Sequence, residues 1–192
     1  YCNGYIEKEL DSIYAKYQFD VAGPKILDKN LNNQNPNYSV LKNKFEIFVH
    51  LLRMDVTFFL VQINLYFFIK KIFKKIRNTE NGRKVIEQNV IIENVPLHGS
   101  AIIFSKKYIK KFKDPFDEST FLYGEEEYLF MRMKYFHLKF VYIPSISFFH
   151  KEDGSLDKLF SANDKGKLKF IIFQTRKSLK KLLLTNFKKE II

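Results

Sequence analysis

Cysteine is almost absent from this chain, in which Cys2 is the only one among 192 residues. A lone cysteine excludes an intrachain disulfide framework and any cysteine-based zinc site, and a reducing compartment is the simplest setting for it. The sequence also lacks a charged and then apolar leader, so we expect no signal peptide. Because the chain begins with Tyr1 rather than methionine, we expect it to be a piece of a longer protein.

Acidic residues are the minority charge: 21 Asp and Glu stand against 33 Lys and Arg, a formal net charge of +12. This excess favours anionic partners such as nucleic acid, phosphorylated substrates or an anionic membrane face, with a generally basic solvated surface as the alternative. A hydrophobic content of 46% and an aromatic content of 17% indicate a folded chain. We expect one domain, because 192 residues suffice for a single sizeable core.

No apolar run in the sequence is long enough to span a bilayer. Residues 40–77 form the longest apolar region and are predicted to be helical, but the densest part, residues 56–69, is interrupted by Gln62 and Asn64. It falls short of the roughly 18–20 residues that a spanning helix needs. From residue 69 onward, apolar residues keep helical spacing on one face and lysines take the other, which is typical of a helix in a membrane interface. A helix packed on the domain, with solvated lysines, is the alternative.

The other segments alternate between helix and strand patterns. Helical spacing predicts a helix over 5–17, and residues 19–27 predict a short buried strand ended by a turn. Residues 28–39 are rich in asparagine and are predicted to be a loop. The further predicted elements are strands at 90–92, 101–104, 140–143 and 146–149, with Pro144 separating the last two, and helices at 106–112 (capped by Ser105), 126–136 and 167–186. This alternation predicts an α/β layered domain.

Three consecutive acids, Glu125, Glu126 and Glu127, stand out in this basic chain. Aromatic and apolar residues flank them on both sides, so they are not a solvated acidic tail. A carboxylate held against apolar surroundings has a raised pKa, and one of a crowded pair can act as a base. The alternative is that these acids open a helix and complement its dipole.

Short motifs follow one another along the chain. They are Gly-Pro-Lys-Ile at 23–26, Pro-Leu-His-Gly-Ser-Ala at 96–101, Pro-Phe-Asp-Glu at 115–118, Phe-Leu-Tyr-Gly at 121–124, Tyr-Ile-Pro at 142–144 with His150, and Thr-Arg-Lys at 175–177. In this order they resemble the inverting glycosyltransferases of family 2, which have the GT-A fold. The resemblance covers nearly the whole chain.

The resemblance implies an α/β fold with a GT-A-like mixed sheet flanked by helices. Residues 1–192 would be a single partial catalytic domain, with residues 40–77 helical and a closing basic helix at about 167–192. The nucleotide-binding half of the family, with its metal-binding Asp-x-Asp, is not in this chain. The family's Glu-Asp is Glu-Glu here, and the later acid of its helix is Tyr128.

Catalytic roles follow from the resemblance for the acids and one histidine. Glu126 falls on the catalytic base, and a slip of one residue would move the base to Glu127. Glu125 would be an acid that contacts the acceptor or tunes the base. His150 matches the family histidine near the diphosphate and a divalent cation, Mg²⁺ or Mn²⁺; a structural histidine is the alternative.

Substrate-binding roles are implied for four other residues. Gly99 and Ser100 would form a close-approach turn under the sugar, since glycine lets the backbone near a ligand. His98 would line the acceptor entrance, and Arg176 would contact the diphosphate or cap the closing helix. Asp117 is expected to stabilise a turn.

The function implied is transfer of a sugar from a nucleotide-sugar donor to a saccharide or polyprenyl-linked acceptor, with inversion, in cell-surface polysaccharide biosynthesis. We expect the protein in the cytoplasm, with peripheral contact at the inner face of the membrane. A catalytically inactive fragment that serves as a scaffold or membrane-associated partner is the alternative. A nucleic-acid-binding module is disfavoured, because the aromatic residues lie mostly in apolar runs that suit a core better than stacking platforms.

Overall fold

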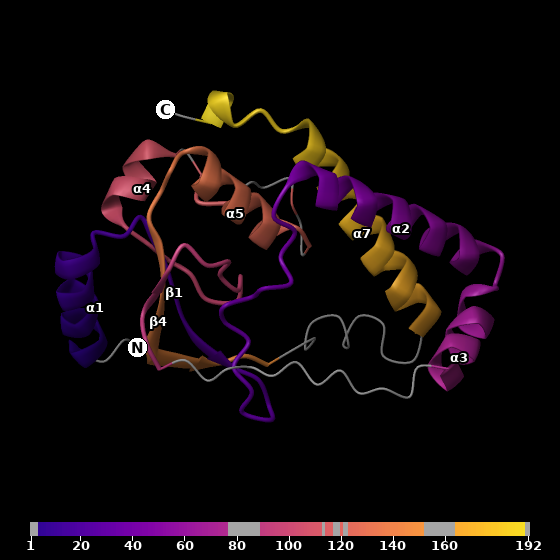
Figure 1. Ribbon diagram of the computed structural model, residues 1–192, viewed down its shortest axis with the longest axis horizontal. Helices are drawn as coiled ribbons and strands as arrows, with labels where there is room; N and C mark the ends of the chain where they lie inside the picture. The colour runs from indigo at the N-terminus through magenta and orange to yellow at the C-terminus, as the bar shows by residue number, and fades with distance from the viewer. Residues whose placement is uncertain are drawn as a thin grey trace.

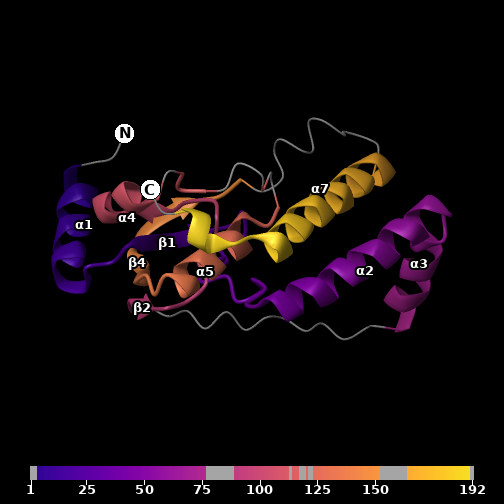
Figure 2. The ribbon, with the colours of Figure 1, turned by 90° about the horizontal axis from the view of Figure 1, so that it is seen from above.

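The computed structural model describes residues 4–76, 89–112, 114–116, 120, 123–151 and 164–190. They form a mixed α/β fold in which a four-stranded sheet is flanked by helices (Figure 1). Three helices, α2 (Lys44–Gln62), α3 (Tyr66–Ile76) and α7 (Asp164–Leu184), extend beyond the sheet as an arm (Figures 1 and 2). The predicted mixed sheet flanked by helices is therefore confirmed.

The sheet has the strand order β2-β4-β1-β3. Its centre is the parallel pair of β1 (Val21–Leu27) and β4 (Phe140–Phe149). The two-residue strands β3 (Ile103–Phe104) and β2 (Ile92–Glu93) pair antiparallel to the outer sides of β1 and β4. A central parallel pair covered on both faces explains why the strand sequences are nearly continuous apolar runs.

Helices cover both faces of the central pair. Successive side chains of a strand point to opposite faces, so Val21 packs in a cluster with α4 (Lys106–Lys111) and α5 (Glu125–Tyr135), whereas Ala22 packs in a cluster with α1 (Gly4–Tyr17). These helices match the predicted ones closely. The predicted cap of α4 is also confirmed, because the Ser105 hydroxyl accepts the Tyr108 N–H at 3.1 Å.

Pro144 does not separate two strands, and that prediction was wrong. β4 runs through the proline as one strand. Pro24 of β1 is opposite Ile143 and the next residue, Lys25, is opposite Ser147, so residues 144–146 lie outside the regular pairing as a bulge. A proline has no N–H to give to a sheet, and a bulge is one of the few places where a strand tolerates it.

The outer edge of β1 is covered in two parts. β3 pairs with the first two residues of the strand. Beyond them the chain leaves β1, turns in a loop and runs back along the same edge as residues 33–37, which we call the asparagine segment. Gln34 donates its N–H to Ile26 O at 2.7 Å, and the Asn35 side chain donates to Pro24 O at 2.7 Å. The segment thus satisfies carbonyl groups that β3 does not reach.

The arm begins with a well-capped helix. At the start of α2, the Asn43 side chain accepts the Glu46 N–H at 2.9 Å, and the Glu46 carboxylate accepts the Lys42 N–H at 2.8 Å. The predicted helical region 40–77 is divided in two, because the chain breaks at Asn64, whose φ of +62° is a left-handed conformation that asparagine tolerates.

The closing basic helix is α7, which runs antiparallel to α2 (Figures 1 and 2). It ends at Leu184, before the 3-10 helix η1 (Phe187–Glu190). Among the described residues, no helix has the length and apolar character that crossing a membrane would require.

Replacing Asn35 with alanine tests how strongly the fold depends on the asparagine segment. Asn35 is 1% exposed, donates to Pro24 O and accepts the His98 N–H at 3.0 Å. The change removes both partners from buried backbone groups, so the free energy of unfolding in urea should fall by about 1–3 kcal/mol. Asn30→Ala, at an exposed position of the same loop, should change it by less than about 0.5 kcal/mol. Equal effects of the two substitutions would contradict this role.

Candidate functional site

The start of α5 is fixed against the helical arm. Gly124, the N-cap of α5, has φ +92°, and a Cβ built on it would lie 3.0 Å from Ser178 Cβ of α7. Both the left-handed backbone and the close approach require glycine at this position. The first turn of α5, which carries the three glutamates, is therefore held at a defined distance from α7.

The Glu126 carboxylate is bound through both of its oxygens. Oε1 accepts the Gly99 N–H at 2.6 Å, and Oε2 accepts a hydrogen bond from the Asn37 side-chain amide. The side chain is 21% exposed, so it remains accessible from solvent. A Cβ on residue 99 would lie 3.1 Å from Glu126 Cγ, which makes this contact too close for most other residues to fit without displacing the carboxylate.

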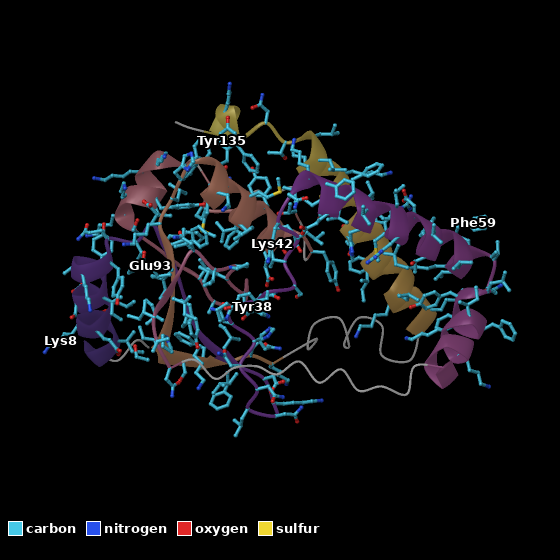
Figure 3. The ribbon with its side chains drawn as sticks, viewed as in Figure 1. Lys8, Tyr38, Lys42, Phe59, Glu93 and Tyr135 are labelled. Carbon is cyan, nitrogen blue, oxygen red and sulfur yellow. The ribbon has the colours of Figure 1, made fainter. Side chains whose placement is uncertain are left out.

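The asparagine segment makes hydrogen bonds to the turn at residues 96–100 as well as to the edge of β1. Asn35 accepts the His98 N–H at 3.0 Å, and Asn37 donates its N–H to Pro96 O at 2.9 Å. The same Asn37 binds Glu126 with its side chain. Figure 1 shows the asparagine segment between the end of β1 and the start of α2, where the chain passes beside α5. In Figure 3 the neighbouring Tyr38 is labelled.

His98 lies beside this carboxylate, and His150 lies against His98. His98 Nδ1 accepts the Ser100 N–H at 3.2 Å, so the neutral ring has its proton on Nε2. The same Nδ1 is 3.6 Å from Glu126 Oε1, a pair that attracts only when the imidazole is protonated. The rings of His98 and His150 meet edge to face, with centroids 5.4 Å apart.

His150 joins the site to the sheet. Its N–H donates to Leu27 O at 2.8 Å, and its ring Nδ1 lies 3.1 Å from Gln34 Oε1. Leu27 and Phe149 are the last residues of the parallel strands β1 and β4, so the site stands at the carboxyl ends of the central pair. In open α/β sheets this edge is where ligands bind most often.

The structure brings together five of the residues singled out from the sequence: Glu126, Gly99, Ser100, His98 and His150. It does not bring Arg176 to them. Arg176 lies on α7, where its guanidinium pairs with Asp55 of α2 and sits 4.5 Å from the centre of the Phe58 ring.

Two further acidic residues were singled out from the sequence. Glu125 is the first residue of α5 and is partly buried. Asp117, which we expected to stabilise a turn, lies outside the described residues.

Glu127 differs from Glu126 in its surroundings. Burial raises the pKa of Glu127 above its ordinary value of 4.5, and the charges of Glu126 and Glu125 raise it further. The backbone N–H of Leu41, bonded to the carboxylate, lowers the pKa in part. Leu41 leads into α2, so Glu127 faces the arm and Glu126 faces the turn at 96–100.

The resemblance implies a divalent cation in this site. Within the described part of the chain, no three His, Cys, Asp or Glu residues gather where they could hold a metal ion. His150 is a single ligand candidate, and Mg²⁺ and Mn²⁺ prefer several oxygen ligands. These residues alone do not fit a cation site built by the protein.

Sequence patterns missed the asparagines that hold the site, because the segment 28–39 was predicted only as a loop. A signal was present. Asn33, Asn35 and Asn37 alternate along the chain, and residues two apart lie on one side of an extended segment. All three use their side chains in the structure: Asn33 donates to the Tyr142 hydroxyl at 2.9 Å, and the other two bind the strand edge and Glu126.

Comparisons with known proteins assign no family to this arrangement. No family model matches the chain, and no match is found among curated proteins or solved structures. The resemblance drawn from the sequence motifs therefore stays a prediction.

Glu127→Gln should reveal the raised pKa of this carboxyl. Because the folded pKa lies above the unfolded one, protonated Glu127 stabilises the fold at low pH, and this contribution is lost as the pH rises from about 4.5 through the raised pKa. Glutamine stays neutral, so the variant should gain stability relative to the wild type as the pH rises above about 4.5. Urea unfolding at several pH values measures the difference.

The matched control is Glu7→Gln, at an exposed position of α1, which should gain less stability than Glu127→Gln because its side chain is solvated. A stability difference between Glu127→Gln and the wild type that stays constant with pH would contradict the assignment.

Proposed function

We propose that this chain carries the acceptor side of an inverting glycosyltransferase with a GT-A-like fold. It would transfer a sugar from a nucleotide-sugar donor to a saccharide or polyprenyl-linked acceptor, in the biosynthesis of a cell-surface polysaccharide. Two things support the proposal: the order of the sequence motifs, and the convergence of His98, Gly99 and His150, from two of these motifs, at one site with Glu126.

The observation that carries the proposal is the anchored and accessible carboxylate of Glu126. An ionised carboxylate has about four acceptor positions. Gly99 and Asn37 occupy two of them, one on each oxygen. Each oxygen therefore keeps one further position, on a side chain that is still 21% exposed.

Such a group suits the base in a direct displacement at the anomeric carbon. The acceptor hydroxyl would approach Glu126 and lose its proton to a carboxylate oxygen as its own oxygen bonds to the sugar. The bond from the anomeric carbon to the donor phosphate breaks in the same step, and the nucleoside diphosphate leaves with the electron pair. Attack from the face opposite the leaving group inverts the anomeric configuration. The hydrogen bonds from the Gly99 N–H and the Asn37 side chain fix the carboxylate before the acceptor arrives, which lowers the entropic part of the barrier.

The histidines suit the side of the leaving group. Negative charge develops on the diphosphate, and donors aimed at it stabilise the transition state. His98 lies 3.6 Å from Glu126 and the His150 ring lies against it, so both imidazoles would be near the reacting groups. In this proposal Mg²⁺ or Mn²⁺ would rely on oxygen ligands from the diphosphate. Arg176 is assigned no role in this step, since its guanidinium pairs with Asp55.

Glu126→Gln tests the base directly. Glutamine preserves the shape of the side chain and cannot take the proton, so kcat should fall by about 100-fold or more, with a much smaller change in KM. The assay is release of nucleoside diphosphate from a panel of nucleotide sugars, with the protein expressed from its complete reading frame.

Glu127→Gln is the matched control for this assay, and it should keep turnover comparable with the wild type. Undiminished turnover in Glu126→Gln would remove Glu126 from the role of base. A loss confined to Glu127→Gln would move the base by one residue.

A further inference from the structure

The solvent-facing side of α2 carries a continuous line of large apolar side chains. Phe45 is 74% exposed and Phe59 is 62% exposed, and the others are exposed by at least 44%. We call this line the α2 stripe; it consists of Phe45, Phe48, Leu52, Val56, Phe59 and Ile63.

The stripe is a distinct face of the helix. Its members are three or four residues apart, which places them on one side at about 100° per residue. Ile47 and Leu51 are buried in a cluster with α5 and α7, and Phe58 lies under Arg176 of α7. These contacts fix the packed side of α2, and the stripe lies on another side, which the described residues leave open.

The helix that follows the stripe along the chain, α3, is basic. In α3, Phe67 is 42% exposed and Phe68 is 63% exposed, and Lys70 and Lys71 are exposed beside them. The sequence of α3 contains no acidic residue. Figures 1 and 2 show α3 at the far end of the arm, away from the sheet, and Figure 3 labels Phe59 on the part of α2 near α3.

We propose that the α2 stripe and α3 dock on an anionic membrane surface. Exposed phenylalanine and leucine next to lysines are the composition of helices that lie in the lipid interface. The stripe runs for about 27 Å along α2 at about 1.5 Å per residue, so it can lie flat on a surface. A net charge of +12 favours an anionic surface and opposes pairing of the stripe with a second copy of the chain. The inference stands on exposure and charge and does not depend on the proposed reaction.

Vesicle sedimentation with the full chain tests the proposal, using phosphatidylcholine vesicles with and without about 30% phosphatidylglycerol. The wild type should bind the anionic vesicles and bind the neutral ones much more weakly. Lys70→Gln/Lys71→Gln should weaken binding to anionic vesicles by about 30-fold, since each lysine near such a surface contributes about 1 kcal/mol. Leu52→Gln/Phe59→Gln removes stripe area at exposed positions and should weaken binding at least tenfold or so.

Matched controls come from α4, at the other end of the molecule (Figure 1). Lys106→Gln/Lys110→Gln removes two exposed lysines, and Ile109→Gln removes an apolar side chain that is 45% exposed. Both should bind within about threefold of the wild type, because these positions lie away from the docking face.

Three outcomes would overturn the proposal. The first is a wild type that binds neither kind of vesicle. The second is equal loss of binding in the α3 and α4 lysine variants, which would indicate a general effect of charge. The third is a concentration-dependent dimer in analytical ultracentrifugation that Leu52→Gln/Phe59→Gln abolishes, which would make the stripe a contact between two copies.

Discussion

The part of the β1 edge that β3 does not reach is the constraint on which the rest of the structure depends. β1 is a central strand, but its neighbour β3 pairs with only its first two residues. Backbone groups farther along the strand need partners, because buried unpaired carbonyls are costly. The asparagine segment, residues 33–37, supplies them by running back along the same edge, with Gln34 and Asn35 as donors.

The same segment then sets the geometry of the candidate site. Asn35 binds Pro24 on one side and the His98 N–H on the other, so the turn at 96–100 is fastened to the strand edge. Two residues later, Asn37 binds Glu126 at the start of α5. The position of the proposed base is therefore a consequence of how the sheet edge is completed. Gly99 adds the second contact to Glu126, at a distance that only a residue without a side chain allows easily.

The elements predicted best from the sequence are those whose signals are local. Apolar periodicity located α1 and α5, and the cap at Ser105 located α4, because helix formation depends on residues three or four apart. Pro144 gave a wrong prediction of where the strand ends, because a bulge lets β4 continue through it. A bulge arises from pairing with another strand, so the local sequence does not reveal it.

Contacts between residues distant in the sequence were harder to predict than these local elements. That Gly99, Glu126, His98 and His150 belong to one site was implied only by the order of the motifs. The asparagine segment was missed because its partners are a strand edge, a turn and a helix start. For Arg176 the motif implied contact with the diphosphate or a cap on the closing helix. Its pair with Asp55 depends on the packing of α7 on α2, which periodicity along a single helix does not reveal.

The central claim is that the asparagine segment holds the Glu126 carboxylate in place, and a double-mutant cycle between Asn37 and Glu126 tests it most directly. The free energy of unfolding would be measured in urea for the wild type, Asn37→Ala, Glu126→Ala and the double variant. A hydrogen bond to a charged group predicts a coupling energy of at least about 1 kcal/mol, so the two single effects should not add. Additive effects, within about 0.3 kcal/mol, would contradict the account.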